Sequence, residues 1–373
     1  AWTLYHLGAA LQEAGDEPAA LAALDEAVRL AEGADDRSLG WRARIARTEV
    51  QNEVDPRSVP TATARAEIVA AIEALTELGD EAGLADAWTK LGFIEFMPCR
   101  FDQAARAEAR AVAYARACGD DRLLFEALRL QMVSESYGST TPDEGLRRLD
   151  ALGDDVRRSR PIELAALAIR SRYLSMRGEV QEARRTIELA AAAAEAVGMR
   201  FFVAVCESLR GQLEYRAGDL DAAERAARRG CEILDATGHV GIKTTHAAYL
   251  ATYLARLGRL EEAERFAAIG RTAAEDDLSS QSFAATAETI VLAARGDLDG
   301  AEDRARAVVA MLADAECPED QGDAWMELAR VLRAAGRPSE AEQASREALA
   351  LYERKGHRPS VDAAMTFLDQ LGP

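Results

Sequence analysis

Apolar residues recur every three or four positions along most of this chain, which is the period of an α-helix. One segment shows the pattern clearly, because between positions 201 and 216 apolar side chains stand at Phe202, Val205, Leu209 and Leu213. Stretches with the same period follow one another from one end of the sequence to the other, and none shows the alternation of a strand. The pattern therefore predicts an all-α protein, with a helix over 201–216.

A second helix is predicted from Leu220 to about Leu234, directly after the first. Between the two helices, Gly218 can end the first helix with a left-handed residue, and Asp219 can cap the start of the second. Small residues line one face of the second helix, at Ala223, Ala226, Ala227 and Gly230. They allow close approach, so the segment is predicted to form an antiparallel helix pair of about forty residues.

The turn around Gly218 is repeated along the chain. Its glycines stand at 178, 218, 258, 296 and 336, in steps of 40, 40, 38 and 40 residues. A fixed period of this length is typical of a solenoid, in which each repeat packs only on its neighbours. We predict nine helix pairs, a single solenoid over 1–373, and a final helix over 361–371 that caps the stack.

The second pair departs from the regular pattern. Its helices are predicted over 39–51 and 62–78, with an extended loop over 53–60 that contains two prolines. Pairs with other turns are predicted at Gly15, around Cys99, and at the break 138–142 that follows a helix over 122–137.

Composition narrows the class of protein. Hydrophobic residues make up 49% of the chain but aromatic residues only 6%, which suits closely packed, alanine-rich helices. The net charge of −19 argues against nucleic-acid binding, because an acidic surface repels phosphate. The five cysteines form no CxxC pair, and no apolar run reaches the length of a membrane span. We therefore expect reduced thiols, a cytoplasmic location and no membrane contact.

Candidate catalytic and metal sites each have a simpler structural explanation. The stretch 238–245 resembles a phosphate-binding loop only faintly, since Ile242 separates Gly241 from Lys243 and a helical segment precedes it. His239 and His246 are seven residues apart, with His239 expected in a turn, and no histidine–cysteine cluster has metal-ligand spacing. Paired acids fall in loops, where they cap helices. We expect no enzyme activity, no metal and no cofactor.

Two groups of residues resemble the tetratricopeptide repeat. They are Trp88, Leu91-Gly92, Ala104 and Ala111, and Leu7-Gly8, Gly15-Asp16, Ala20 and Ala27. The repeats here are about six residues longer than the usual 34 and lack the proline that often closes each one. Long alanine-rich repeats of this kind are similar to the carboxy-terminal arrays of bacterial ATPase-coupled transcription regulators and nucleotide cyclases, and the ending 348–356 resembles how such arrays finish. Since a helical pattern starts at Trp2 without a preceding methionine, the chain is expected to be a fragment joined to regulatory domains.

The resemblance implies a right-handed superhelix with a concave groove lined by the first helix of each pair. Transferring the repeat template places these residues in it: Tyr5, Gln12, Phe93, Phe96, Ser134, Tyr137, Arg172, Gln212, Tyr215, Arg216, Thr252, Arg256, Arg330 and Arg333. Of these, Phe96, Ser134, Tyr137, Arg172, Gln212, Tyr215, Arg216, Thr252 and Arg256 form the candidate site for a protein or peptide segment, or for a small anionic ligand. In the alternative interpretation, the phenylalanines are core residues and the arginines pair with acids of the chain.

The expected function is a non-catalytic sensor arm of a bacterial signalling or transcription-regulatory protein. Occupancy of the groove would change the curvature of the solenoid and bias an attached switch, which requires different affinities for two curvatures. The alternative is an assembly scaffold that mediates protein–protein contacts or forms a homodimer without sensing a ligand.

Overall fold

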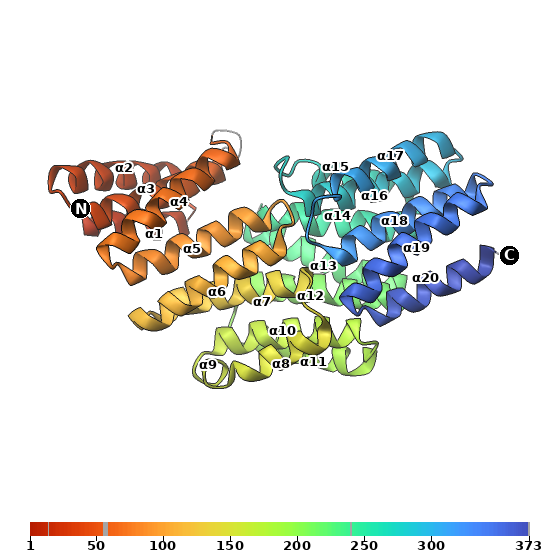
Figure 1. Cartoon of the computed structure of the whole chain (residues 1–373), viewed down its shortest axis with the longest axis horizontal. Helices are drawn as coiled ribbons and strands as arrows, with labels where there is room; N and C mark the ends of the chain where they lie inside the picture. Colours follow the sequence, from red (N-terminus) through yellow and green to blue (C-terminus); the bar gives the residue numbers. More distant parts are fainter. Residues whose placement is uncertain (14, 55–58, 239–240, 372–373) are drawn as a thin grey trace. The chain divides into compact units, whose positions relative to one another are not determined.

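The computed structural model describes residues 1–13, 15–54, 59–238 and 241–371, and within these ranges the chain is α-helical without strands (Figure 1). Two compact units are present. The first comprises 1–96 with 103–131, and the second comprises 97–102 with 132–373. Continuity of one solenoid over the whole chain stays a prediction.

The first unit is built from six helices and the beginning of a seventh. These are α1 (Trp2–Glu13), α2 (Glu17–Gly33), α3 (Arg37–Val54), α4 (Thr61–Leu78), α5 (Glu81–Phe96), α6 (Phe101–Cys118) and α7 (Asp121–Tyr137). Neighbouring helices in this unit pack closely, as α1 does on α2 and α2 on α3.

The second unit takes in the end of α7 and all later helices. They are α8 (Pro142–Ala151), α9 (Gly153–Arg158), α10 (Arg160–Met176), α11 (Val180–Ala196), α12 (Arg200–Arg216), α13 (Leu220–Thr237), α14 (Gly241–Arg256), α15 (Leu260–Gly270), α16 (Leu278–Ala294), α17 (Leu298–Met311), α18 (Pro318–Ala334), α19 (Pro338–Lys355) and α20 (Arg358–Leu371). Figure 1 shows α14 to α19 as successive helix pairs lying side by side.

The helices pack pairwise, as predicted. In chain order, and with the short α9 set aside, close packing joins α1 to α2 and α3 to α4 in the first unit. In the second unit it joins α10 to α11, α12 to α13, α14 to α15, α16 to α17 and α18 to α19, and α20 packs on α19. The second helix of the pair around Gly218 matches its prediction closely, because α13 begins at Leu220 and ends three residues beyond Leu234. The helical period of the apolar residues was therefore sufficient to predict the all-α class.

The repeated turn has the geometry predicted for it. All five glycines adopt left-handed backbone angles, with φ between 74° at Gly336 and 86° at Gly296. Asp219 then caps α13, since its Oδ1 atom accepts a hydrogen bond from the Ala222 amide at 2.9 Å. Asp297 makes the same bond to Gly300 at 3.0 Å. Where the position after the glycine holds glutamate or arginine, the side chain makes no capping bond.

Small residues bring the helices of a pair together, also as predicted. Ala223 and Ala227 are buried on the face of α13 that meets α12. A methyl group on Gly230 would lie 3.2 Å from the His246 ring and 3.5 Å from the Ala204 carbonyl. These positions therefore set the spacing of α12, α13 and α14, which carry part of the candidate site.

Three details differ from the sequence predictions. Glu53 and Val54 continue α3, so the predicted loop starts later; residues 55–58 lie outside the described part of the chain, as does His239. The six-residue α9 was not predicted, because a segment this short carries almost no periodic signal. The last helix starts at Arg358, three residues before the predicted 361, because the His357 Nδ1 atom accepts a hydrogen bond from the Ser360 amide.

Candidate functional site

Three arginines project into the interior of the second unit, one from each of three successive first helices. Arg172 lies on α10, Arg216 on α12 and Arg256 on α14, at intervals of 44 and 40 residues. Arg216 and Arg256 are the last residues of their helices, where the helix dipole favours a positive charge. We call these residues the arginine row.

The arginine row is paired with acids of α18 in the same unit. Glu319, Asp323 and Glu327 recur every four residues, so they share one face of that helix, which we call the acidic face. The bonds run in order along the helix. Arg172 donates to Glu319 at 2.5 Å; Arg216 donates to Glu319 at 3.0 Å and to Asp323 at 2.9 Å; Arg256 donates to Glu327.

The pair at the start of this series is the most deeply buried. The Arg172 and Glu319 side chains are 4% and 7% exposed. Burial opposes the charged form of both groups, but their mutual attraction outweighs it. The pKa of Glu319 therefore lies well below its usual range, and the pKa of Arg172 lies above its usual range. Both groups are charged, and removing either would leave the other charge buried without its partner.

Tyr137 and Gln212 complete the surroundings of Arg172. The guanidinium carbon lies 3.8 Å from the centre of the Tyr137 ring, which is a cation–π contact. Arg172 also donates a hydrogen bond to the Gln212 Oε1 atom at 2.6 Å, and the Gln212 amide donates to the Tyr137 hydroxyl at 3.2 Å. Three residues predicted to line the groove thus form one bonded group.

Tyr215 and Thr252 lie beside the arginine row and make different kinds of contact. The Tyr215 ring stacks on Tyr253, with ring centres 5.1 Å apart. The Thr252 hydroxyl donates to the Ala248 carbonyl at 3.1 Å within α14. The Thr252 hydroxyl is thus satisfied by a main-chain carbonyl, and the side chain contributes to the interior through its packing.

Seven of the nine predicted site residues therefore gather in the interior of the second unit: Tyr137, Arg172, Gln212, Tyr215, Arg216, Thr252 and Arg256. Ser134 is fully buried in α7. Phe96 is the half-buried last residue of α5 and belongs to the first unit. The arginines pair with acids of the chain, as the alternative interpretation expected, and binding of a ligand by these residues stays a prediction.

A buried lysine, absent from the sequence prediction, joins the end of α19 to the end of α7. The Lys355 Nζ atom donates hydrogen bonds to the carbonyls of Ser136, Gly138 and Thr140 at 2.8, 2.6 and 2.8 Å. Burial, with a contribution from Arg172, lowers the pKa of Lys355 to about 7. The chain contains only two other lysines, and this rarity is the one signal that could have singled out Lys355.

His357 extends the same network. Its Nδ1 atom accepts from the Ser360 amide, so Nε2 carries the hydrogen, and Nε2 lies 3.4 Å from the Glu319 Oε1 atom. Glu319 therefore receives contacts from α10, α12 and the start of α20. Its place as the common acceptor depends on tertiary packing, which no local pattern in the sequence reveals.

A cavity of about 80 Å³ lies next to the arginine row, between α12, α14, α16 and α18. Its wall includes Tyr249 and Phe283, whose ring centres are 4.4 Å apart. Asp320 also lines it, 6% exposed and without a hydrogen bond or ion pair to any described residue. Burial and the neighbouring Glu319 and Asp323 carboxylates raise the pKa of Asp320 to about 7.

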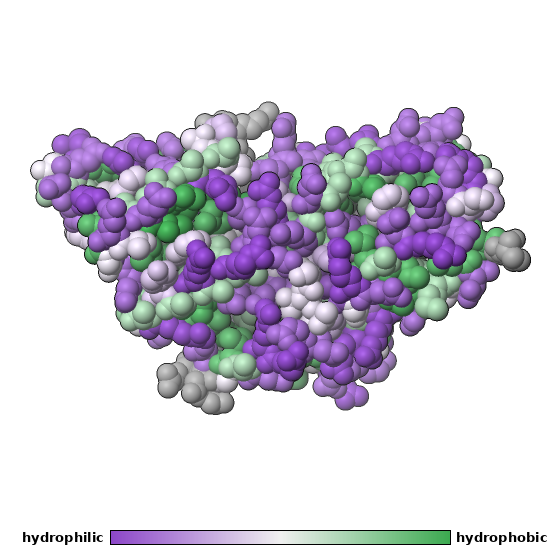
Figure 2. All heavy atoms as spheres, viewed as in Figure 1, coloured by the Kyte–Doolittle hydropathy of each residue, from purple (hydrophilic) through white to green (hydrophobic). Residues whose placement is uncertain are grey.

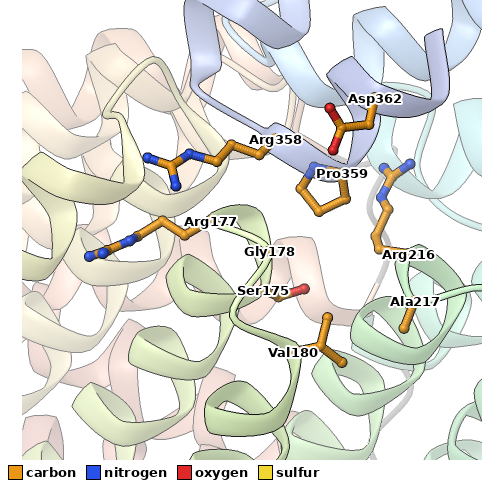
Figure 3. Close-up of a pocket in the computed structure, with 9 residues that line it drawn as sticks. All are labelled: Ser175, Arg177, Gly178, Val180, Arg216, Ala217, Arg358, Pro359 and Asp362. Carbon is orange, nitrogen blue, oxygen red and sulfur yellow. The ribbon is translucent and has the colours of Figure 1, made fainter. Parts of the chain in front are cut away.

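A second, shallower hollow of about 380 Å³ lies at the ends of α10, α12 and α20. Figure 3 shows the Arg177 and Arg358 guanidinium groups on one side of it, with Arg216 and Asp362 on the other. Arg177 pairs with Glu179 at 2.7 Å, and Arg216 belongs to the arginine row. The positive charge of this hollow is therefore largely balanced by acids of the chain.

The other chemical candidates have structural roles. His246 is buried, with its ring nitrogens 2.9 and 3.3 Å from the carbonyls of Ile242 and Ala204, and burial lowers its pKa. Burial raises the pKa of the Cys206 and Cys231 thiols to about 12. Across the described ranges, no group of three histidine, cysteine or acidic side chains is placed to bind a metal ion.

The surface in view is predominantly hydrophilic, with apolar residues scattered between charged ones (Figure 2). None of the described helices combines the length and the apolar character that a membrane crossing needs.

Comparison with known proteins identifies the fold. No protein-family model and no curated protein matches the sequence. A Rap protein solved in complex with competence and sporulation factor is similar, with a TM-score of 0.55 and 13% identity over 99% of this chain and 96% of that one. The Cut9–Hcn1 hetero-tetramer of APC/C gives 0.52 and 12% identity over 99% and 89%. The chain thus has a tetratricopeptide-like repeat fold.

Proposed function

We propose that this chain is a non-catalytic binding arm whose arginine row recognises carboxylates on a partner protein. The observation that supports this is the series of pairs from Arg172 to Glu319, Arg216 to Asp323 and Arg256 to Glu327. Three arginines from three repeats engage one acidic helix in a single register. The row is therefore arranged to bind a helical segment with acids at every fourth position.

The spacing of the charges supplies the specificity. Four residues of an α-helix advance by about 6 Å, so the acids of such a partner would meet the row one after another. Arginine suits this task because its planar guanidinium group can bind a carboxylate through two hydrogen bonds. A partner can reach the row only when the acidic face of α18 moves away. Binding is therefore coupled to a rearrangement of the repeats.

We further propose that this arm belongs to a bacterial signalling or transcription-regulatory protein. The long alanine-rich repeats and the tetratricopeptide-like fold support this role. In it, displacement of the acidic face by a partner would change the arrangement of the repeats and so bias an attached regulatory domain. The free energy available for that change equals the difference in partner affinity between the two arrangements.

A competition experiment tests the proposal. A fluorescently labelled peptide with the sequence of residues 316–334 is titrated with the full chain and with the Asp323→Asn/Glu327→Gln variant. Weakening the internal pairs frees the row for a larger fraction of the time, so the variant should bind the peptide about tenfold more tightly or better.

The matched control is a peptide of the same sequence with glutamine and asparagine at its three acidic-face positions, which should not bind. Equal binding of the two peptides, or the absence of binding to a variant with native circular dichroism, would contradict the proposal.

An assembly scaffold is the alternative function, and one observation favours it. Leu189 on α11 and Val197 at its end are 62% and 53% exposed, unlike most large apolar side chains of this unit. Contiguous exposed apolar surface often marks contacts with another chain. Light scattering over a range of concentrations separates the two functions, because a concentration-dependent dimer abolished by Leu189→Ser favours the scaffold.

A further inference from the structure

The cavity between α12, α14, α16 and α18 has the chemistry of a small-molecule site. We propose that it binds a compact ligand carrying a protonated amine, with the Asp320 carboxylate as its counter-ion. This site is separate from the carboxylate-binding role of the arginine row, because it uses a residue of opposite charge and takes a different class of ligand.

Asp320 is the residue that carries the inference. A carboxylate that is 6% exposed is stable only when a positive charge or hydrogen-bond donors satisfy it, yet Asp320 makes no hydrogen bond or ion pair within the described chain. Two arginines attract it, Arg172 and Arg216, but both donate to the neighbouring Glu319 or Asp323. The cavity beside Asp320 is where the missing partner would fit.

The charges along the wall of the cavity favour a cation over an anion. Arg216, Arg256 and Arg330 line it, and each donates to a carboxylate of the acidic face. The acidic face supplies Glu319, Asp323 and Glu327 to the same wall, so the three guanidinium groups face three engaged carboxylates. Asp320 is the fourth acid and remains without a partner. A ligand with one positive charge would balance it.

Aromatic rings supply the rest of the site. Tyr249 and Phe283 pack against each other on one part of the wall, and Tyr215 stacks on Tyr253 on another. Faces of aromatic rings attract ammonium groups and also accept an apolar ligand body. A cavity of about 80 Å³ has the volume of roughly three liquid waters. The ligand is therefore an alkyl or small aryl amine rather than a large cofactor.

Ligand binding should be linked to a proton. The pKa of Asp320 is influenced by Glu319 and Asp323 on its own helix, by Arg172 on α10 and by Arg216 on α12. The charge of Asp320 in turn influences the pKa values of Tyr249 on α14 and Lys355 on α19. The net environment favours the protonated carboxyl up to neutral pH. An ammonium group favours the carboxylate instead, so binding releases the proton, and affinity should rise about tenfold between pH 6 and pH 8.

Isothermal titration calorimetry on the full chain tests the proposal, with n-butylammonium and tetramethylammonium as probes and 1-butanol as the neutral analogue. We expect at least one ammonium probe to bind at millimolar concentration or below, at least about tenfold more tightly than 1-butanol. Titrations of that probe in phosphate and in HEPES buffer should differ in heat, because a proton is released.

Two variants complete the test. Asp320→Asn keeps the size of the side chain and should weaken ammonium binding at least about tenfold, whereas Asp314→Asn, at an exposed position before α18, should leave it unchanged. The proposal is overturned if neither ammonium probe binds, if 1-butanol binds equally well, or if Asp320→Asn binds as wild type does.

The proton-release measurement uses the wild-type chain, so the proposal can still be rejected if the Asp320→Asn variant does not fold. The peptide titration of the arginine row is a separate assay with a separate ligand, and its failure would leave this result standing.

Discussion

Arg172 and Glu319 are 147 residues apart in the chain and form a buried ion pair with an N···O distance of 2.5 Å. The pair links α10 to α18, although between them lie the helices of three further repeats. Each member of the pair has further contacts. Arg172 also contacts Gln212 and the Tyr137 ring, and Glu319 also accepts a hydrogen bond from Arg216. The pair therefore connects an early helix of the second unit with one from its last repeat.

Replacing Arg172 by methionine should reduce the free energy of unfolding by about 3–5 kcal/mol, because Glu319 would then be buried with much of its compensation lost. Urea denaturation followed by circular dichroism measures the change. The double variant Arg172→Met/Glu319→Met should recover most of that loss, since it removes both charges. Arg185→Met is the control, because Arg185 is exposed on α11 and should matter little. A loss for Arg172→Met no larger than for the control contradicts the prediction.

Lys355→Met should also destabilise the second unit, by about 2–4 kcal/mol, because three main-chain carbonyls at the end of α7 would lose their donor. Thermal unfolding in a calorimeter gives the difference. Lys243→Met is the matched control, since Lys243 is partly exposed and pairs with Asp235. Equal transition temperatures for the two variants would show that the three hydrogen bonds contribute nothing net.

Asp320→Asn should change the pH dependence of stability. The folded chain raises the pKa of Asp320 from 3.8 to about 7, so the folded state binds this proton more tightly than the unfolded state. That stabilisation is complete below pH 4 and is lost as the pH rises towards 7. Between pH 5 and pH 8 the wild-type protein should therefore lose about 2–3 kcal/mol of stability that the variant does not lose. Urea midpoints at the two pH values test this, and a constant difference would rule out the raised pKa.

Gly145→Ala should destabilise α8 although alanine favours helices. An added methyl group would lie 2.1 Å from the ring of Tyr173, which is fully buried and has no room to move. Overpacking of this kind costs about 1–3 kcal/mol. Gly40→Ala is the matched control, because Gly40 is also the fourth residue of its helix and its nearest neighbour would be 3.9 Å away. That variant should be neutral or up to about 1 kcal/mol more stable. Similar effects at both positions would contradict the predicted clash.

Asp219→Ala should lower stability by about 0.5–2 kcal/mol, through loss of the hydrogen bond to the Ala222 amide that caps α13. Glu179 occupies the same position one repeat earlier but makes no capping bond. Glu179→Ala should therefore change stability by less than about 0.5 kcal/mol. Chemical denaturation of the two variants side by side distinguishes them, and the reverse order of effects would refute the assignment of the cap.

The sequence predicted the features that depend on local chemistry. Gly218 and Asp219 mark a turn because a left-handed residue and a capping acid have strong intrinsic preferences, and both behave as predicted. Helix ends were predicted to within a few residues for the same reason. The short α9 escaped detection because six residues are too few to show a period.

The sequence predicted the arginines of the candidate site but not the acids that pair with them. Arg172, Arg216 and Arg256 were placed in the interior by the repeat template, because equivalent positions of a repeat face the same way. Their partners on α18 were missed, since pairing over 71 to 147 residues depends on how far each repeat rotates on the next. Acids spaced by four on a first helix were the available signal, but the same spacing is common on exposed faces.

The separation of Arg172 from Glu319 also has a consequence for protein synthesis. The arginine row leaves the ribosome long before α18 does, so the central repeats emerge with cations that have no partner yet. Folding of the second unit can therefore be completed only after α18 and Lys355 have been synthesised. A chain stalled or cut before α18 would expose an unpaired basic interior, a feature by which quality-control proteases could tell it from the finished product.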